Sequence, residues 1–453
     1  MDIAQSVKRK AAAPEDSLPK KITSQANGDR GRKFVHTSLR RPLFVVFSSS
    51  SSTTASSSHH LEDTAASGDA VMTIHQLPTE MLCYILSYLP LPEQLKVATV
   101  SWCWKRAVDD CLAKRRHFSD ELIPGLKSQR VTDCWLEKVL SRMSGVQNFA
   151  GVRGVDMDIA ILIRHCHQLV TANLYMFRVT VSSLKRLCQS CPKLKDIILP
   201  KSCDDACVEE LIDGLPELSA LSLTMNKTSG RFLSRLPASL RRLSLSGRWK
   251  CQPTERLPAT SITELDISGL WDPPPAALAS LLRMCPRLER LNAKECSVTD
   301  SFVEQLPKRT PGIRDLNLEG CGASAAGLLS LGLLRELRRL NLMDTDTTDA
   351  VLLRLHGLPH LSELAVGTHP FNGPDFSLDT LADLVASCPS LRLLVPTEMV
   401  YTDVVLDNLV GRLEQGRRLT VAVGSDDISD FDERIRENPA FRLLPYEECD
   451  TFE

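Results

Sequence analysis

Apolar residues in the middle of the chain recur as L-x-x-L-x-L at a nearly constant interval. The interval between units ranges from 22 residues, between Leu218 and Leu240, to 30 residues, between Leu361 and Leu391. A period in this range predicts a solenoid in which every unit forms one structural repeat. The first apolar positions of the ten units are Leu169, Leu194, Leu218, Leu240, Ile262, Leu288, Ile313, Leu337, Leu361 and Leu391.

Each unit has the pattern of a short strand followed by a helix. Leu316 and Leu318 follow Ile313 at the alternating spacing of a strand with one buried face. Leu184, Leu187 and Cys188 have helical spacing. Because helices are wider than strands, stacked units should curve. We expect an α/β leucine-rich-repeat solenoid, a horseshoe with parallel strands on the concave side and helices on the convex side.

Three further helices are predicted ahead of the repeats, in residues 73–118. Pro78 suits a helix start, and Met81, Leu82, Ile85, Leu86 and Leu89 then follow at helical spacing. A second helix is expected after residues 90–92, and a third around residues 102–108. A unit of about forty residues is too small to be stable alone. The solenoid or a partner should therefore complete its apolar surface, and surface left exposed on residues 77–108 would favour a partner.

The two ends of the chain differ from the centre. Residues 1–72 lack periodicity, contain a Ser/Thr tract and predict a disordered basic tail. The basic clusters at residues 8–10 and 20–21 have the spacing of a nuclear import signal, or belong to a solvated tail. We therefore expect the protein in the nucleus, the cytoplasm or both. The repeats occupy residues 119–424, and residues 425–453 form an acidic tail or a degenerate last unit.

Composition narrows the classes of partner. The net charge of −2 gives no overall electrostatic basis for binding nucleic acid or a membrane surface. No apolar run approaches the ~18 residues of a membrane-spanning helix. The 15 cysteines are expected to be thiols in a reducing compartment. Pairs such as Cys188 and Cys191 have zinc-ligand spacing, but most cysteines recur in phase with the repeat, which favours buried packing residues over a metal site.

No catalytic pattern is found in the sequence. It contains no glycine-rich phosphate loop, no H-E-x-x-H motif and no nucleophile elbow. A cysteine-dependent transferase would need an accessible, activated thiolate, and cysteines in repeat phase do not meet that need. We therefore expect a protein without catalytic activity and without a cofactor.

Two segments resemble known families. LPTEMLCYILSYLPLPEQLKVATVSWCWKRAVDD, residues 77–110, resembles an F-box, and CPRLERLNAKECSVTDSFVEQL, residues 285–306, resembles the cysteine-containing leucine-rich repeat. Their order is that of F-box/leucine-rich-repeat proteins, the substrate receptors of SCF-type cullin–RING ubiquitin ligases. The resemblance implies that the first segment binds the SCF adaptor subunit, and through it a cullin. It assigns the adaptor contacts to Leu77, Pro78, Ile85, Leu89, Leu95 and Val100.

The chain departs from the family after the third predicted helix. Family F-boxes often carry a further tryptophan there, whereas this sequence reads Ala-Lys-Arg-Arg-His-Phe at residues 113–118. How the F-box packs on the first repeats is therefore left open by the sequence. Residues 119–165 are poor repeats, in which Val146, Phe149 and Gly151 suggest a degenerate opening strand.

A substrate protein is expected on the concave face, since concave solenoid faces are extended binding surfaces. Long basic side chains at outward strand positions are the candidates for binding an acidic or phosphorylated segment. These residues are Arg242, Arg290, Lys294 and Arg339. Asn292, Asn317 and Asn341 recur in one phase and suggest a polar ladder that serves the scaffold. Two alternatives remain: an F-box scaffold acting outside a ligase, and a plain repeat protein whose first helices only cap the solenoid.

Overall fold

The repeat period produces one long parallel sheet. The structure, a computed structural model, describes residues 77–122, 131–151, 157–249, 257–367, 375–397, 406, 408–409, 412–413, 417–423 and 440–445. They all lie in the unit Val71–Glu453. The predicted N-terminal tail, its basic clusters and most of the acidic C-terminal segment lie outside the described residues. In each of the ten units the strand begins two residues after the first apolar position, as at Asp196 after Leu194.

Among the described residues the sheet contains 15 strands, which pair in parallel. Its order follows the sequence, except that β10 pairs with β8 beside the main path, and β3 and β5 form a separate two-stranded sheet. The strands are β1 (His117–Phe118), β2 (Asn148–Phe149), β3 (Met157–Asp158), β4 (Thr171–Asn173), β5 (Phe177–Arg178), β6 (Asp196–Ile198), β7 (Ala220–Thr224), β8 (Arg242–Arg248), β9 (Glu264–Asp266), β10 (Leu270–Trp271), β11 (Arg290–Asn292), β12 (Asp315–Asn317), β13 (Arg339–Met343), β14 (Glu363–Gly367), β15 (Leu393–Thr397), β16 (Leu419–Val423) and β17 (Phe441–Pro445).

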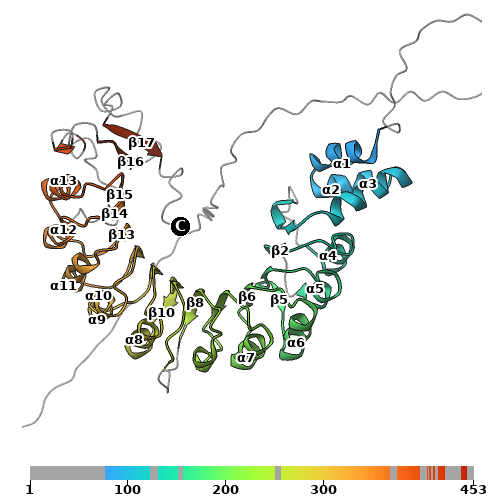
Figure 1. The fold of residues 1–453 in the computed structure, drawn as a ribbon, viewed down its shortest axis with the longest axis horizontal. Coiled ribbons are helices and arrows are strands. Elements are labelled where there is room, and N and C mark those ends of the chain that lie inside the picture. Colours follow the sequence, from blue (N-terminus) through green and yellow to red (C-terminus); the bar gives the residue numbers. More distant parts are fainter. Residues whose placement is uncertain are drawn as a thin grey trace, which may run out of the picture. The chain divides into compact units, whose positions relative to one another are not determined.

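Helices and shorter helical turns follow most strands on the outer side of the sheet (Figure 1). None of the described helices is long and apolar enough to cross a bilayer. The α-helices are α1 (Thr79–Ser87), α2 (Leu91–Val97), α3 (Trp102–Ala113), α4 (Asp133–Leu140), α5 (Ala160–His165), α6 (Val181–Ser190), α7 (Asp205–Gly214), α8 (Pro275–Met284), α9 (Asp300–Val303), α10 (Leu306–Arg309), α11 (Ala325–Leu328), α12 (Asp349–Leu355) and α13 (Leu378–Ser387); the 3-10 helices are η2 (Asp120–Leu122), η4 (Arg231–Arg235) and η5 (Leu329–Leu333). The predicted solenoid, with strands inside and helices outside, is confirmed.

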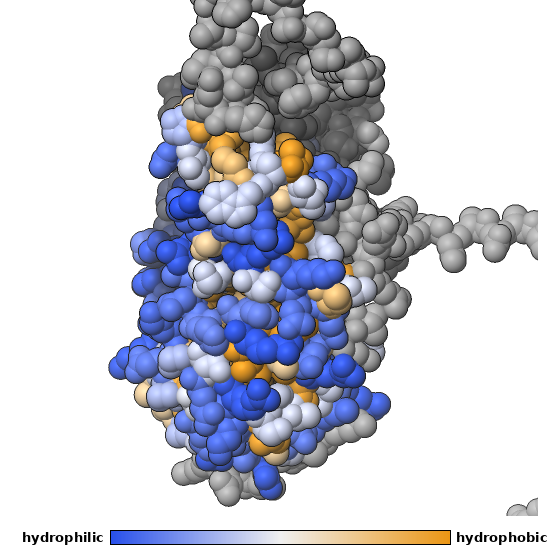
Figure 2. Space-filling model, turned by 90° about the vertical axis from the view of Figure 1, so that its right-hand side faces the viewer, coloured by the Kyte–Doolittle hydropathy of each residue, from blue (hydrophilic) through white to orange (hydrophobic). Residues whose placement is uncertain are grey.

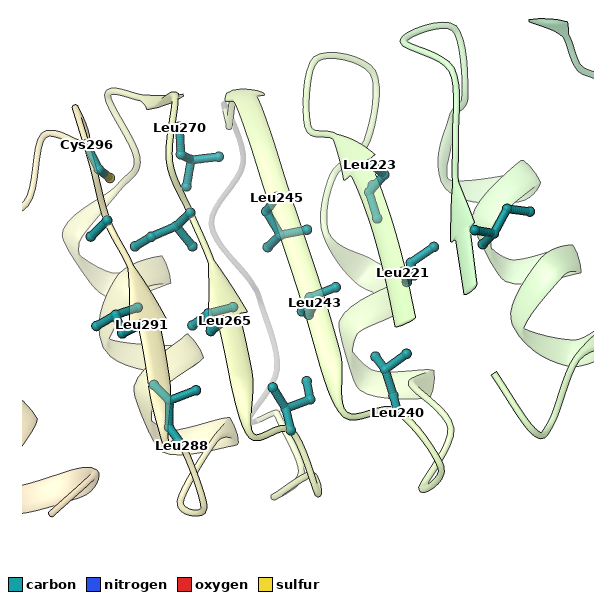
Figure 3. Packing of buried hydrophobic residues seen from close by; sticks show 14 of the residues in the cluster. Leu221, Leu223, Leu240, Leu243, Leu245, Leu265, Leu270, Leu288, Leu291 and Cys296 are labelled. Carbon is teal, nitrogen blue, oxygen red and sulfur yellow. The ribbon is translucent and has the colours of Figure 1, made fainter. Parts of the chain in front are cut away.

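The core lies between the strands and the helices and continues from one repeat to the next. Leu243, Leu265 and Leu291 occupy the same register on β8, β9 and β11, and each is at most 2% exposed. Their side chains lie on the helix side of the sheet, in one layer (Figure 3). Alternate residues of the same strands point to the concave side, because side chains alternate across a strand. The L-x-L pattern therefore separates the core from the concave face.

Polar side chains fix where several helices begin. Thr180 accepts a hydrogen bond from the backbone N–H of Ser183, and the Ser183 hydroxyl accepts one from the Thr180 N–H, which is a capping box at α6. Asp204 caps α7 by accepting from the Cys207 N–H at 3.0 Å. That contact also lowers the pKa of Asp204, because it stabilises the ionised carboxylate.

The three N-terminal helices form where the sequence predicts them. Pro78 directly precedes α1, and Pro92 lies in the first turn of α2. Ser101 caps α3 by accepting from the Trp104 N–H. Gln94 is completely buried, and its amide donates to the carbonyls of Leu86 at 2.7 Å and Leu89 at 2.8 Å. This glutamine satisfies carbonyls at the end of α1 and ties α1 to α2.

The third helix runs directly into the repeat sheet. Strand β1 follows α3 and pairs with β2, whose Asn148 N–H donates to the Arg116 carbonyl at 2.9 Å. The rings of Phe118 and Phe149 stack with centroids 5.4 Å apart, and Phe149 contacts Phe177 at 5.7 Å. These phenylalanines connect the helical unit to the first repeats, at the packing contact that the sequence left open. Phe149 lies in the opening strand that the sequence suggested.

The sheet also extends further toward the C-terminus than the clear repeats. Strands β16 and β17 add to it in parallel, with Val421 opposite Leu443. β17 lies in the segment for which the sequence left a tail or a degenerate last unit open, and it has the pairing of a repeat unit.

The cysteines of the repeats are packing residues. Cys166, Cys191, Cys285 and Cys388 are completely buried, and the Cys191 thiol donates to the Cys166 carbonyl at 3.1 Å. Burial raises the pKa of Cys166, Cys191 and Cys285 to about 12, since it penalises the thiolate. Within the described residues, no group of three or more His, Cys, Asp or Glu side chains is placed to hold a metal ion.

A charge in the leucine layer should destabilise the solenoid. We expect Leu265→Asp or Leu316→Asp, each at a position 2% exposed, to cost several kcal/mol in the free energy of unfolding, because the carboxylate has no partner there. Thermal unfolding measures the effect. Glu264→Gln, at the adjacent outward position, is the control and should cost at most about 1 kcal/mol. A Leu265→Asp protein that melts at the wild-type temperature would contradict the register.

Thiol reactivity should divide the cysteines by burial. At pH 8 a thiol of pKa about 12 is only ~0.01% thiolate, so Cys166, Cys191 and Cys285 should resist iodoacetamide in the folded protein. Cys103 and Cys134 are exposed and should be alkylated first. Peptide mass mapping after brief labelling checks this order, with urea-unfolded protein as the control. Equal labelling of Cys191 and Cys103 in folded protein would refute it.

Candidate functional site

A group of large apolar side chains is exposed on and directly after α1, in the turn between α2 and α3, and at the start of α3. We call it the apolar patch; it comprises Met81, Tyr84, Ile85, Tyr88, Val100 and Trp102, which are 40% to 73% exposed. Figure 2 views the side of the molecule on which these helices lie, and apolar side chains gather in its upper part while hydrophilic ones predominate below. Exposed apolar patches of this kind mark interaction sites.

The helices that carry the apolar patch bury their opposite faces in the core. Leu82 and Leu86 on α1 and Val108 and Leu112 on α3 are at most 1% exposed and join the core that continues into the repeats. The facing sides of α1 and α3 are therefore buried, as the Cys83 thiol donating to the Ala107 carbonyl also shows, and the opposite sides are uncovered. By the criterion set from the sequence, this exposure favours a partner over a simple cap.

Aromatic contacts give the apolar patch a defined shape. The rings of Tyr84 and Tyr88 pack edge to face at 5.2 Å, and the Tyr88 hydroxyl donates to the Tyr84 hydroxyl at 2.5 Å. This hydrogen bond raises the pKa of Tyr88. The Arg106 guanidinium lies 5.6 Å from the Trp102 ring, a cation–π contact. Ordered side chains lose less conformational entropy on binding.

The six predicted adaptor contacts divide between the surface and the margin of the core. Pro78, Ile85 and Val100 are exposed, whereas Leu77, Leu89 and Leu95 are half-buried and pack against the core. Sequence reasoning did not select Tyr84, Tyr88 and Trp102, which supply much of the exposed apolar surface. The signal for Tyr84 and Tyr88 was available, since both are large aromatic residues outside the stripe predicted to be buried, whereas Trp102 was expected on the apolar face of the third helix.

The concave face carries a ladder of alternating charge. Parallel register aligns one outward residue from each strand, β6 to β14, in a row. We call this row the charge ladder; in order across the sheet it is Asp196, Ala220, Arg242, Glu264, Arg290, Asp315, Arg339 and Glu363. Neighbouring cations and anions are therefore held one strand apart, about 4.8 Å.

The four basic residues predicted to contact a substrate are all paired with carboxylates. Arg242 reaches over Ala220 to Asp196 at 3.0 Å, and Arg339 binds Asp315 at 2.6 Å. Arg290 forms an ion pair with Glu264. Lys294 binds Glu319 at 2.8 Å. The pair of Arg242 is exposed, whereas those of Arg339 and Lys294 are half-buried. Exposed ion pairs are worth about 0–1 kcal/mol, so a partner can replace a pair such as that of Arg242 at small cost.

A hollow lies in the concave face where small residues interrupt the charge ladder. Ala220, Ser222 and Ser244 contribute to its lining, and the cavity volume is about 470 Å³. Arg242 and Asp266 also line it, and the Ser244 hydroxyl donates to Asp266 at 3.1 Å. Burial raises the pKa of Asp196 at the same site, and the charge of Arg242 opposes this shift. The hollow is large enough for one or two side chains of a bound protein.

The recurring asparagines support the backbone. The side-chain carbonyls of Asn292, Asn317 and Asn341 each accept from the backbone N–H two residues ahead, at 3.0 to 3.2 Å. Asn341 also donates to Glu319 at 3.1 Å. These contacts hold the backbone at the carboxyl ends of β11, β12 and β13, as expected for a scaffold role.

A comparison with family models finds a match at the N-terminal helices. The model of the F-box-like family matches residues 74–119. The Tonsoku-like protein of Danio rerio is 27% identical over 216 residues, which are 47% of this chain and 13% of that protein. This chain therefore corresponds to a small part of that relative.

One solved structure that resembles the chain is the crystal structure of the Rad7 and Elc1 complex in yeast. It superimposes with a TM-score of 0.39 at 13% identity, covering 83% of this chain and 98% of that chain. The chain therefore combines an F-box-like domain at residues 74–119 with stacked strand–helix repeats that continue in one parallel sheet.

Proposed function

We propose that the protein is the substrate-recognition subunit of an SCF-type cullin–RING ubiquitin ligase. The observation that carries the proposal is the apolar patch, which is exposed on the segment matched by the F-box-like family. In this proposal the F-box-like helices bind the adaptor subunit, and through it a cullin. The concave face binds a substrate protein.

Burial of the apolar patch supplies the driving force for adaptor binding. Fully burying a Leu or Ile side chain contributes ~1.5–3 kcal/mol, and Trp and Tyr are frequent anchors of interfaces. The six large side chains of the apolar patch stay exposed although Leu82 and Leu86 on α1 are buried. A helical unit that only capped the solenoid would not need this exposed apolar surface. A partner helix packed across α1 and α3 would cover them.

The protein itself contributes proximity to the reaction. Stacked phenylalanines and the β1–β2 pair join the F-box-like helices to the solenoid. Asp109 of α3 also lies 3.6 Å from Arg142 in the first repeats. Such a connection would hold a bound substrate at a set distance from the ligase, which raises the effective concentration of its lysines. In this role the protein needs no catalytic residues and no cofactor.

A scaffold that binds the adaptor outside a ligase is the second candidate function. It is favoured by the same apolar patch, since adaptor binding alone does not specify a cullin. Reconstitution with adaptor, cullin and RING subunit separates the two: a receptor assembles with all of them, whereas a scaffold stops at the adaptor. A nuclear or cytoplasmic location stays a prediction from the basic clusters.

Removing the apolar patch should abolish adaptor binding. We expect Leu77→Ala/Pro78→Ala to lose co-purification with the adaptor subunit. Because Leu77 is half-buried and Pro78 precedes α1, Val100→Glu is the cleaner variant: this side chain is 67% exposed and its change leaves the core intact. We expect an affinity loss of at least ~30-fold, about 2 kcal/mol, measured by titration calorimetry.

The matched control is Leu333→Glu, which places the same charge on a comparably exposed apolar residue in η5. It should bind the adaptor like the wild type. Undiminished adaptor binding by a folded Val100→Glu protein would sink the proposed interface.

Reversing two charges of the charge ladder should reduce substrate capture. Arg290→Glu/Arg339→Glu removes two replaceable ion pairs and repels an acidic or phosphorylated segment, so we expect substrate capture to fall ~10-fold or more with adaptor binding intact. Quantitative interaction proteomics measures the change. Arg164→Glu/Arg235→Glu breaks exposed ion pairs on the helical side, away from the charge ladder, and is the control. An unchanged set of substrates would exclude the charge ladder as the recognition site.

A further inference from the structure

The carboxyl ends of several strands, and the loops that follow them, carry exposed basic residues that lie outside the charge ladder. Exposed Lys201, Lys227 and Arg248 follow β6, follow β7 and end β8, respectively. Exposed Tyr175 follows β4, and Trp271 ends β10. We call these five residues the basic rim. They come from strands that are consecutive neighbours in the sheet, so they form one continuous edge.

Side-chain and backbone contacts order the basic rim. The Lys201 ammonium lies 5.2 Å from the centroid of the Tyr175 ring. The backbone N–H of Arg248 donates to the side chain of Asn226, the neighbour of Lys227, at 2.9 Å. Arg248 and Trp271 are direct partners in the β8–β10 pair, so their side chains stand next to each other on one face. A cation therefore lies beside an aromatic ring at each end of the rim, with Lys227 between.

Trp271 is held in an exposed position by its neighbours in the chain. Leu270 is completely buried and appears at the edge of the leucine layer in Figure 3, whereas Trp271 is 69% exposed. Asp272 then turns the chain with a left-handed φ of 51°, a conformation uncommon outside glycine. A tryptophan left in water at a fixed place adds nothing to the core, and Trp is enriched among the residues that dominate binding energies.

The cations of the basic rim differ from those of the charge ladder in having no carboxylate partner among the described residues. Across the described residues, Lys201, Lys227 and Arg248 form no ion pair with a carboxylate, in contrast to Arg242, Arg290, Arg339 and Lys294. Lys227 is near enough to Asp204 to help lower the pKa of that carboxyl. Asp204 and Asp272 interrupt the positive charge, so the rim is a poor surface for the continuous phosphates of a nucleic acid.

We propose that the basic rim binds a short acidic protein segment that carries an aromatic or aliphatic anchor. Carboxylates of the segment pair with the three cations, and the anchor packs on Trp271 or Tyr175. Four strand spacings of about 4.8 Å separate the two ends of the rim, so about six residues of extended chain, at ~3.3 Å each, span it. The backbone N–H groups of a peptide are compatible with Asp204 and Asp272. The inference does not depend on adaptor binding or on the charge ladder.

The test uses the full-length chain and random twelve-residue peptides displayed on phage. Selections are run on the wild type and on Lys201→Glu/Lys227→Glu/Arg248→Glu/Trp271→Ala, and peptides enriched on the wild type are synthesised and titrated by fluorescence anisotropy. The control variant is Lys185→Glu/Arg186→Glu/Lys308→Glu/Leu353→Ala. It reverses three charges and shortens one exposed apolar side chain, all at exposed helix positions. Thermal unfolding establishes that both variants are folded. A twelve-residue oligothymidylate is titrated in parallel.

We expect the enriched peptides to combine Asp or Glu with aromatic or aliphatic residues. Their affinity should fall at least 10-fold in the rim variant, stay unchanged in the control variant and weaken as salt is raised. The proposal is overturned if no peptide is enriched, if enriched peptides lack acidic residues, if they bind a folded rim variant equally well, or if the oligothymidylate binds more tightly than the peptides. Val100→Glu should bind these peptides normally, so failure here is distinguishable from failure at the adaptor.

Discussion

The burial of one apolar face against the next repeat is the interaction on which the whole structure depends. A strand and a helix of about 24 residues have no closed core of their own, and the leucines of β8, β9 and β11 become buried only because they stack in register. Stability is therefore shared among neighbours. Changes at a buried leucine should affect several repeats, whereas changes on the concave face affect mainly local contacts.

The same dependence extends to the F-box-like helices. The side chains buried on their inner face belong to the same hydrophobic cluster as the solenoid core, and Phe118 and Phe149 stack where α3 leads into the first repeats. Because the inner face is used in this way, only the outer face remains for a partner. Burial of the inner face thus both stabilises the helical unit and leaves the apolar patch exposed on the outer face.

The charge ladder and the basic rim both contain basic residues but differ in how those residues are paired. Parallel register places Arg290 beside Glu264 and Arg339 beside Asp315, so the concave charges are largely neutralised in place. The basic rim lies where strands end, and there the register no longer supplies a carboxylate for each cation. A partner gains more Coulomb energy at unpaired cations than at paired ones, since no existing contact has to be replaced.

The sequence by itself determined the repeat architecture and the helical unit before it, because periodicity reports directly which side chains are buried. The strands of all ten units begin two residues after the predicted positions, and Leu184 and Leu187 lie on α6 as expected. The ion pairs of Arg242 and Arg290, the stacking of Phe118 on Phe149 and the exposure of Tyr88 and Trp102 were decided only by the tertiary structure. The ion pairs and the ring stacking join residues 20 or more positions apart, and the exposure of Tyr88 and Trp102 depends on which helix faces are covered. A local sequence pattern predicts neither.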